Sequence, residues 1–279
     1  MDGRRSTVVL FGAGIQEHAW DPVARVLART AFDQVVTGDQ ANGALANLVY
    51  NLRFWTLKVA GEAKQGSVRA DTQAAFDVYL NSYREIRSQI ATELESAETS
   101  GELRLWPTFE GVWNALVSST VHLSIVTTNW DRLLTKVAAR QWSDVDENAV
   151  FHVHGDRRDP ELLLLPTELV AEPYREPEVT QALGLRKKGI MDLMGQTQSL
   201  VISGLSLSPM DAELAHILAV GIDHGKVEEV HIADPKHALV CGRLMILLRH
   251  RQPAIFGYDP KNPKKKKAYK WRVRREEAG

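Results

Sequence analysis

The chain has 279 residues, 44% of them hydrophobic and 25% charged, and its formal net charge at pH 7 is -1. A chain of this length and composition can bury a substantial core in one large domain or two small ones, and its near-zero charge excludes a whole-molecule field that attracts nucleic acid. Its single cysteine, Cys241, excludes an intramolecular disulfide framework and any zinc module built from four thiolates, and we expect this residue in the core.

The N-terminal residues predict a cytoplasmic protein. No apolar run reaches membrane-spanning length, and residues 1–5 lead directly into a short strand instead of the hydrophobic centre of a signal peptide. We therefore expect no membrane contact.

The first predicted strand is residues 7–11, and Gly12, Ala13 and Gly14 follow it directly. Glycine permits positive φ and lets a phosphate approach the backbone N–H groups in the first turn of the next helix. The turn therefore favours nucleotide binding, although the third glycine of a dinucleotide fingerprint is absent. Gln16 lies just beyond, where a solvated loop is the alternative.

Residues 21–108 show helical periodicity almost throughout, which predicts a cap over a ligand crevice. Its apolar stripes are Val23, Val26, Leu27 and Phe32; Leu45, Leu48, Val49, Leu52, Phe54 and Leu57; and Phe76, Val78, Tyr79, Tyr83, Ile86, Ile90 and Leu94. We expect these stripes in the core. Because large apolar residues such as Trp55 exceed what one cap needs, the region is also a candidate surface for self-association or for an activating partner, with internal packing as the alternative.

Residues 121–134, VHLSIVTTNWDRLL, predict a buried strand, a polar turn and a helix. Thr128, Asn129 and Asp131 occupy the turn. In an open α/β sheet the ligand crevice lies outside the carboxyl ends of the strands, where a carboxamide offers both a donor and an acceptor to a sugar or an amide. The alternative is that Asn129 or Asp131 only caps the helix.

Residues 149–156, AVFHVHGD, predict a strand with His152 and His154 on the same face. No third ligand with zinc-like spacing accompanies them, so we predict no metal site. His154 falls at the end of the strand beside Gly155, so its imidazole can reach the same crevice as Asn129. A hydrogen-bonded structural histidine is the alternative.

Further strands are predicted at residues 162–165 and 199–203. The first is a short buried or edge strand. The second delivers Gly204, Ser206 and Asp211 before the next helix, so small and hydrogen-bonding groups again follow a strand.

The sixth predicted strand, residues 229–233, ends in Asp234, whose carboxylate can bind a ribose diol or merely start an Asp-Pro turn. Ligand-type residues thus follow five of the predicted strands. Their coincidence predicts an α/β fold with a doubly wound, mainly parallel Rossmann-like sheet of about six strands and a large helical insertion, residues 21–108, after the first strand.

Four motifs in this order and spacing, GAG, TTNWD, HVHGD and GLSLSPMDAEL, resemble the sirtuin-like fold, and most closely its prokaryotic anti-phage defence members, which hydrolyse NAD. The resemblance covers residues 7 to 234, with the helical region similar only in position. It implies NAD in the crevice, with Asn129 and His154 in the places of the catalytic asparagine and histidine. The nucleotide contacts that it implies are Gly12, Ala13, Gly14, Gly204, Ser206 and Asp234. We expect Gln16, Thr128 and Asp131, in the same strand-end turns, to contact NAD as well.

Two departures separate the chain from the sirtuin deacylases. Those enzymes carry a four-cysteine zinc module and a serine after GAG, whereas this chain has one cysteine and reads Ile15-Gln16. No zinc is expected, and the missing serine leaves open a weakly active enzyme or a sheet that only binds nucleotide.

We therefore expect an NAD glycohydrolase that releases nicotinamide and ADP-ribose through an oxocarbenium-like state. The resemblance implies a regulated bacterial immune effector that depletes NAD, activated as a homo-oligomer or by a partner protein. The alternatives are a regulatory subunit that binds NAD or ADP-ribose without turnover, an NAD-dependent protein deacylase, and a structural subunit with a decayed site.

After the NAD-binding domain of residues 1–258, residues 259–279 form a basic segment. Its cations are Lys261, Lys264, Lys265, Lys266, Lys267, Lys270, Arg272, Arg274 and Arg275. With Tyr269 and Trp271 among them, this segment is the one candidate for nucleic-acid contact, through phosphates and base stacking. The favoured alternative is an edge hairpin between residues 253–258 and 268–273, whose lysines keep it soluble.

Overall fold

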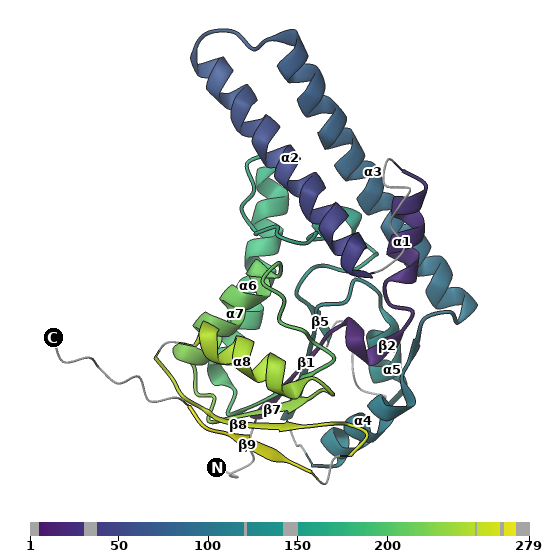
Figure 1. Cartoon of the computed structure of the whole chain (residues 1–279), viewed down its shortest axis with the longest axis vertical. Helices are drawn as coiled ribbons and strands as arrows, with labels where there is room; N and C mark the ends of the chain where they lie inside the picture. The colour runs from purple at the N-terminus through teal and green to yellow at the C-terminus, as the bar shows by residue number, and fades with distance from the viewer. Residues whose placement is uncertain are drawn as a thin grey trace, which may run out of the picture.

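The computed structural model describes residues 6–30, 38–119, 122–141, 150–248, 250–262 and 265–271. Its centre is a seven-stranded sheet in the order β5-β4-β1-β6-β7-β8-β9, in which only β8 and β9 pair antiparallel (Figure 1). The strands are β1 Ser6–Phe11, β4 His122–Thr127, β5 Val150–His152, β6 Ser199–Ser203, β7 Glu229–Ala233, β8 Ala254–Tyr258 and β9 Lys267–Tyr269. The chain is therefore an α/β protein with a mostly parallel sheet, compatible with a Rossmann-like fold.

The strand order contains one reversal, and it lies beside β1. The chain runs from β1 outward to β4 and β5, then returns to the other side of β1 at β6 and continues through β7 and β8. This is the 3-2-1-4-5-6 order of dinucleotide-binding sheets with an antiparallel edge strand added. Because the connections on the two sides leave the sheet in opposite directions, a crevice opens outside the carboxyl ends of β1 and β6.

Helices cover both faces of the sheet, which explains why β1 is a continuous apolar run. Val8 and Leu10 pack in one core with α6, α7 and α8, whereas Val9 and Phe11 pack in another with α4 and α5. These helices are α4 Pro107–Ser119, α5 Leu133–Gln141, α6 Pro177–Gln196, α7 Ala212–Asp223 and α8 His237–Leu247. Cys241 of α8 is buried in the first core, as expected.

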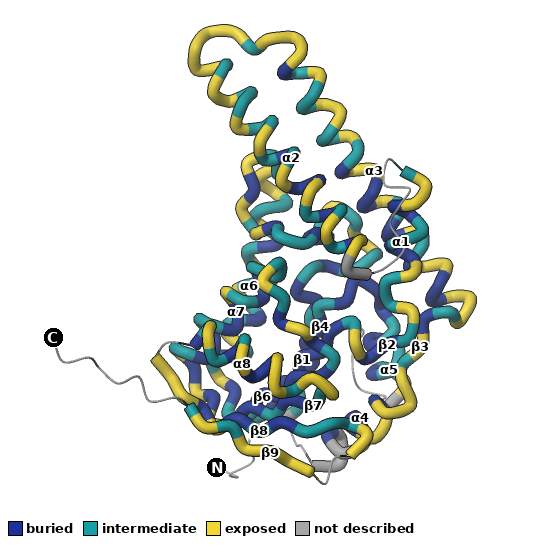
Figure 2. The backbone as a smooth tube through the Cα atoms, in the orientation of Figure 1, coloured by how far each residue is buried: buried dark blue, intermediate teal, exposed yellow. Residues whose placement is uncertain are grey.

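The helices α1 (Asp21–Ala28), α2 (Gly38–Lys64) and α3 (Ala70–Ser100) follow β1 along the chain. The pair α2 and α3 extends away from the sheet, and its outer part is largely exposed (Figures 1 and 2). Leu45 and Leu52 are fully buried near its base, but Phe54 and Leu57 are 49% and 64% exposed. The expectation that every stripe residue lies in the core is wrong for these outer positions, because the outer part of the pair extends beyond the body of the molecule. Phe32 lies outside the described residues.

A small second sheet closes the base of this helical region. Its strands are β2 Gln16–Glu17 and β3 Arg104–Leu105, which pair antiparallel. The pairing joins the residues before α1 to those after α3. It therefore holds Gln16 beside the end of β1, where a loop was the alternative.

The strand predicted at residues 162–165 is wrong. The segment forms a short 3-10 helix, η2 Pro160–Leu162, followed by irregular chain in which Leu164 N donates to His154 O at 2.9 Å. Leu163 and Leu165 are buried against helices α1, α2 and α3 rather than in the sheet. An apolar run can be buried by helices as well as by a sheet, and only a partner strand makes it β. The observed sheet also contains β8 as a parallel strand, which was not among the strands predicted for the sheet.

The C-terminal hairpin is present between β8 and β9, with Ile255 opposite Tyr269 and Gly257 opposite Lys267. Trp271 Nε1 donates to Pro253 O at 2.9 Å, which ties the end of the hairpin to its start. Lys264 and the arginines at 272, 274 and 275 lie outside the described residues. Throughout the described part of the chain, no helix combines the length and the apolar character that crossing a membrane requires.

Candidate active site

A cavity of about 800 Å³ lies at the carboxyl ends of β1, β4, β5, β6 and β7. Every predicted site residue except Gly12 lines it. These lining residues are Ala13, Gly14, Gln16, Thr128, Asn129, Asp131, His154, Gly204, Ser206 and Asp234. The fold thus brings residues from five separated strand ends to one site at the reversal of the strand order.

The three glycines of the site lie where the loops after β1 and β6 cross in contact. Gly12 N donates to Ser203 O at 3.0 Å and Gly14 N to Gly204 O at 2.8 Å. Gly204 has a φ of +64°, and a Cβ there would lie 2.5 Å from the Ile15 nitrogen. Glycine is therefore required at these positions, because the two loops approach each other closely. Gly12 lies in this contact between the loops and does not line the cavity.

The turn after β1 does not lead into the expected helix. Ala13–Ile15 forms a single 3-10 turn, η1, which continues into β2. Gly14 N and Ile15 N donate to the carbonyl oxygens of Gly204 and Gly12, so these N–H groups are already bonded within the protein. The prediction of a phosphate cradle at a helix N-terminus is wrong here, because the chain pairs with β3 before its next helix begins.

The turn after β4 separates the roles of its two polar side chains. Asp131 Oδ1 accepts from Leu133 N at 2.9 Å, at the start of α5, and from Gln16 Nε2 at 2.7 Å. Asn129 is only 6% exposed, yet among the described residues neither its Nδ2 nor its Oδ1 has a hydrogen-bond partner. Asp131 therefore caps the helix, whereas the carboxamide of Asn129 is left for a ligand. A buried polar group without a partner costs about 1–3 kcal/mol.

Asp131 and Gln16 form a buried polar pair in the wall of the cavity. Burial raises the pKa of Asp131 to about 6, although the hydrogen bonds from Leu133 N and Gln16 act in the opposite direction. Within the described chain, Gln16 Oε1 is buried and has no partner. The amide oxygen of Gln16 thus adds a second unpaired acceptor to the cavity.

The two histidines of the HVH motif have different places. His152 ends β5 and is buried outside the cavity, where its Nδ1 donates to Asn129 O at 2.9 Å. Burial lowers its pKa, so the neutral ring supports the Asn129 turn. His154 lines the cavity, because β5 ends at His152 and the chain turns at Gly155, whose φ is +80°. The expectation of one common face is wrong, since it assumed a continuous strand.

His154 is paired with Asp211, a partner that the sequence did not reveal. Its Nε2 donates to Asp211 Oδ2 at 3.1 Å, while Asp211 Oδ1 accepts from Leu214 N at 3.1 Å as the N-cap of α7. Burial opposes the imidazolium, but the charge and hydrogen bond of Asp211 outweigh it and raise the pKa of His154. With Nε2 held by Asp211, the buried Nδ1 has no partner in the described part of the chain. Asp211 was recognisable from sequence only as a cap.

Asp234 and Ser206 line the far side of the cavity from the strand ends β7 and β6. Asp234 Oδ1 accepts from Lys236 N at 2.6 Å, so the Asp-Pro turn is present, and burial raises the pKa of this carboxyl. Arg243 Nη1 donates to Ser206 O at 2.8 Å. Lys236 and Arg243 also line the cavity and supply positive charge, which sequence reasoning missed because both follow the last recognised motif.

Backbone strain is concentrated at this cavity. Among the described residues, the non-glycine residues with positive φ are His18 at 59°, Thr167 at 72° and Leu207 at 50°, and all of them line it. Each such conformation costs about 1–3 kcal/mol and persists only where surrounding contacts impose it. The clustering supports a functional site.

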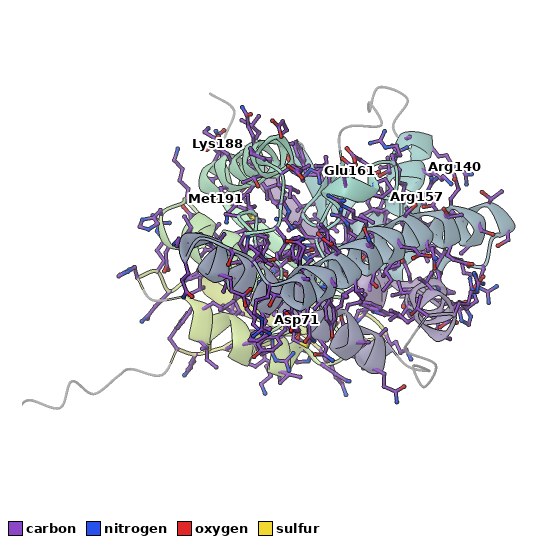
Figure 3. All side chains as sticks on the ribbon, turned by 90° about the horizontal axis from the view of Figure 1, so that it is seen from above. Asp71, Arg140, Arg157, Glu161, Lys188 and Met191 are labelled. Carbon is purple, nitrogen blue, oxygen red and sulfur yellow. The ribbon has the colours of Figure 1, made fainter. Side chains whose placement is uncertain are left out.

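The helical region is fixed to the site through Glu98 of α3. Its fully buried side chain accepts from Arg132 N at 2.7 Å and from Arg157 Nε at 2.8 Å, and it pairs with Lys136 Nζ at 2.6 Å. Arg157, labelled in Figure 3, also donates its backbone N–H to Trp130 O. Residues of α1, α2 and α3 therefore form part of the cavity wall, which contains Val23, Asn42 and Leu94.

Compared with known proteins, the sequence matches no family model and no curated protein.

Proposed function

We propose that the protein hydrolyses NAD at the bond between nicotinamide and ribose. The observation that carries this proposal is the buried carboxamide of Asn129, which has no hydrogen-bond partner among the described residues and lies in the same cavity as the His154–Asp211 pair. An amide suits the hydroxyl groups of a ribose, and a histidine held by a carboxylate suits proton transfer. The resemblance of TTNWD and HVHGD to the motifs of NAD-hydrolysing sirtuin-like proteins supports the same pairing.

The reaction needs one water molecule and no further reactant. The bond between ribose C1′ and the pyridinium nitrogen breaks, and nicotinamide leaves with the electron pair as a neutral molecule. Water oxygen then bonds to C1′ of the oxocarbenium-like ribose, and its proton passes to Nδ1 of His154. Asn129 positions the ribose and the water.

The remaining wall of the cavity has groups suited to the rest of NAD. The volume of about 800 Å³ is within the range of small-molecule sites. Asp234 can accept from the adenosine ribose diol, and the positive charges of Lys236 and Arg243 suit the diphosphate. Gln16 Oε1, in the region where the deacylases carry their serine, offers an acceptor to a hydroxyl group.

We further propose that helices α1 to α3 act as an insertion after the first strand of a sirtuin-like domain, residues 1–258. In this proposal they cover the nicotinamide end of the cavity, as the lining residues of all three helices support. The biological role we propose is that of a cytoplasmic immune effector that depletes NAD after activation through a second copy or a partner protein.

The test is nicotinamide release from NAD by the purified chain, alone and with candidate activators. We expect Asn129→Ala and His154→Ala each to lower the rate by at least about 100-fold, the scale of general base catalysis. Matched controls are Asn51→Ala and His216→Ala, which remove the same chemical groups outside the cavity and are expected to retain the rate. Wild-type rates in the Asn129 and His154 variants contradict the assignment.

The melting temperatures of these variants separate a catalytic from a structural loss. Asn129→Ala removes a side chain with no partner in the described chain, so stability is expected to stay equal or rise. A fall of several degrees with the loss of activity contradicts a purely chemical role for Asn129.

A regulatory module that binds NAD or ADP-ribose without turnover is the second candidate. It is favoured by Gln16, which stands in the region where the deacylases carry their serine and whose Nε2 is bonded to Asp131. Calorimetry with NAD, paired with the nicotinamide assay, distinguishes the two: heat of binding without product identifies the module.

A further inference from the structure

A second cavity, of about 350 Å³, lies between α3, the η2 segment and the start of α6, and shares no lining residue with the first. Its wall contains Tyr83, Arg84 and Arg87 of α3, Glu161 of η2, and Tyr174 and Arg175 before α6. Glu161 is labelled in Figure 3. Three arginines and two tyrosines around one cavity are not used by the proposed reaction.

Arg87 is the central feature of this cavity, because it is a buried cation without an acid. The residue is 7% exposed, and its Nη1 donates only to the carbonyl oxygens of Glu161, at 2.8 Å, and Leu163, at 3.4 Å. Its guanidinium lies 4.2 Å from the centre of the Tyr83 ring. Across the described residues no carboxylate pairs with it, and its buried Nε has no partner. A buried charge is expensive unless an opposite charge accompanies it.

The other two arginines differ in how they are paired. The side chain of Arg175 is 3% exposed and donates to Glu168 at 2.6 Å, but its Nε has no partner among the described residues. Arg84 lies at the exposed rim, 3.8 Å from Glu176, which is also exposed. The acids that line the cavity, Glu161 and Glu176, are both exposed to solvent. Glu168 therefore balances the charge of Arg175, and Arg87 remains the buried cation of this cavity with which no carboxylate of the described residues pairs.

We propose that the second cavity binds the phosphate group of a small metabolite. A phosphate supplies the missing negative charge for Arg87 and acceptors for the unpaired Nε atoms of Arg87 and Arg175, whose planar donors match its geometry. The cavity volume is at the lower end of the range for small-molecule sites. The rings of Tyr83 and Tyr174, 5.4 Å apart, provide apolar wall for the remainder of the metabolite.

A hydrogen-bond network joins this site to the first cavity. Glu168 lines the first cavity, and its Oε1 accepts from Tyr83 OH at 2.7 Å, from Tyr174 OH at 2.8 Å and from Arg175. All three donors line the second cavity. A phosphate in the second cavity contacts the donors that position Glu168 in the wall of the first cavity. The binding of this phosphate does not depend on the binding or hydrolysis of NAD.

The test is calorimetric titration at low ionic strength with inorganic phosphate, ribose 5-phosphate and ribose. We expect both phosphates to bind, ribose 5-phosphate at least as tightly as inorganic phosphate, and ribose not to bind. Arg87→Gln is expected to weaken both by at least tenfold. Arg251→Gln, at an exposed arginine that lines neither cavity, is the matched control and is expected to leave the affinity unchanged. Arg243→Gln, which removes an arginine of the first cavity, identifies phosphate that binds there instead.

Because Arg87 also holds the backbone of Glu161, the folding of its variant is checked by circular dichroism and thermal melting. Arg84→Gln, at the exposed rim, serves as a second variant, and we expect it to weaken phosphate binding about threefold. Unchanged affinity in both the Arg87 and Arg84 variants overturns the proposal. So does a loss in Arg243→Gln alone, which places the phosphate in the first cavity, or binding of inorganic phosphate without ribose 5-phosphate, which leaves only a free ion.

Discussion

At the scale of single residues, Asp131 shows how burial and capping act against each other. Its carboxylate accepts from Leu133 N and Gln16 Nε2, yet burial raises its pKa from 3.8 to about 6. A carboxyl whose pKa is higher in the folded state binds its proton more tightly there. Folding is therefore favoured as pH falls from about 6 toward 4, and the cost of the buried charge is fully present above pH 6.

We expect Asp131→Asn to be more stable than the wild type at pH 7, because an amide oxygen still accepts at Oδ1 without carrying a charge. Two pKa units correspond to about 3 kcal/mol, which is the upper limit of the gain. The difference in unfolding free energy between the variant and the wild type, measured by denaturant titration, is expected to decrease steadily as the pH falls from 6 to 4. A difference that is constant over this range contradicts the raised pKa.

The pair of His154 and Asp211 gives a second prediction at this scale. Asp211→Asn keeps an N-cap acceptor for Leu214 but removes the negative charge that raises the pKa of His154. The imidazole is therefore expected to titrate at lower pH in this variant, as followed by its ring proton resonances. In the proposed reaction the neutral ring is the base, so the rise of nicotinamide release with pH is expected to move to lower pH as well.

A control variant separates this pair from general charge effects. Asp192→Asn, which removes an exposed carboxylate outside the cavity, is expected to leave the titration of His154 unchanged. A His154 titration that Asp211→Asn leaves unchanged, or moves to higher pH, contradicts the pairing.

At the scale of elements, the site depends on how closely the loops after β1 and β6 approach. Gly204 has a φ of +64° and lies against Ile15 and Gly14, so a methyl group there meets backbone atoms at 2.5 and 2.7 Å. We expect Gly204→Ala to lower the free energy of unfolding by at least about 2 kcal/mol, from the left-handed conformation and the overlap together.

The matched control is Gly43→Ala in α2, where a Cβ meets nothing within 4 Å. Alanine in a helix interior is expected to stabilise by about 0.5–1 kcal/mol. Denaturant unfolding of the two variants measures both effects. Equal changes in unfolding free energy in the two variants contradict the close approach of the loops after β1 and β6.

At the scale of the whole molecule, the α2–α3 pair exposes an apolar face. Tyr50, Phe54 and Leu57 follow one another at helical spacing on α2 and are 66%, 49% and 64% exposed, and Val78 of α3 is 61% exposed. Self-association through the helical region therefore stays a prediction, with this exposed apolar face as its candidate surface.

If a second copy covers this face, sedimentation velocity is expected to show a species larger than the monomer that grows with concentration. Leu57→Glu is expected to shift the protein toward the monomer. Ile246→Glu, at an 80% exposed apolar position on α8, is the control and is expected to leave the distribution unchanged. A monomer at every concentration, with and without NAD, removes this prediction.

The sequence by itself determined where the cavity lies and ten of the residues that line it. Periodicity placed β1, β4, β6 and β7, and small or polar residues at their ends predicted one crevice, because the carboxyl ends of parallel strands share one edge of a sheet. Only the tertiary structure decided which side chains meet. It paired His154 with Asp211, joined Gln16 to Asp131, and buried residues 162–165 under helices instead of in the sheet. These outcomes rest on contacts between residues far apart in the chain, and local spacing carries no information about them.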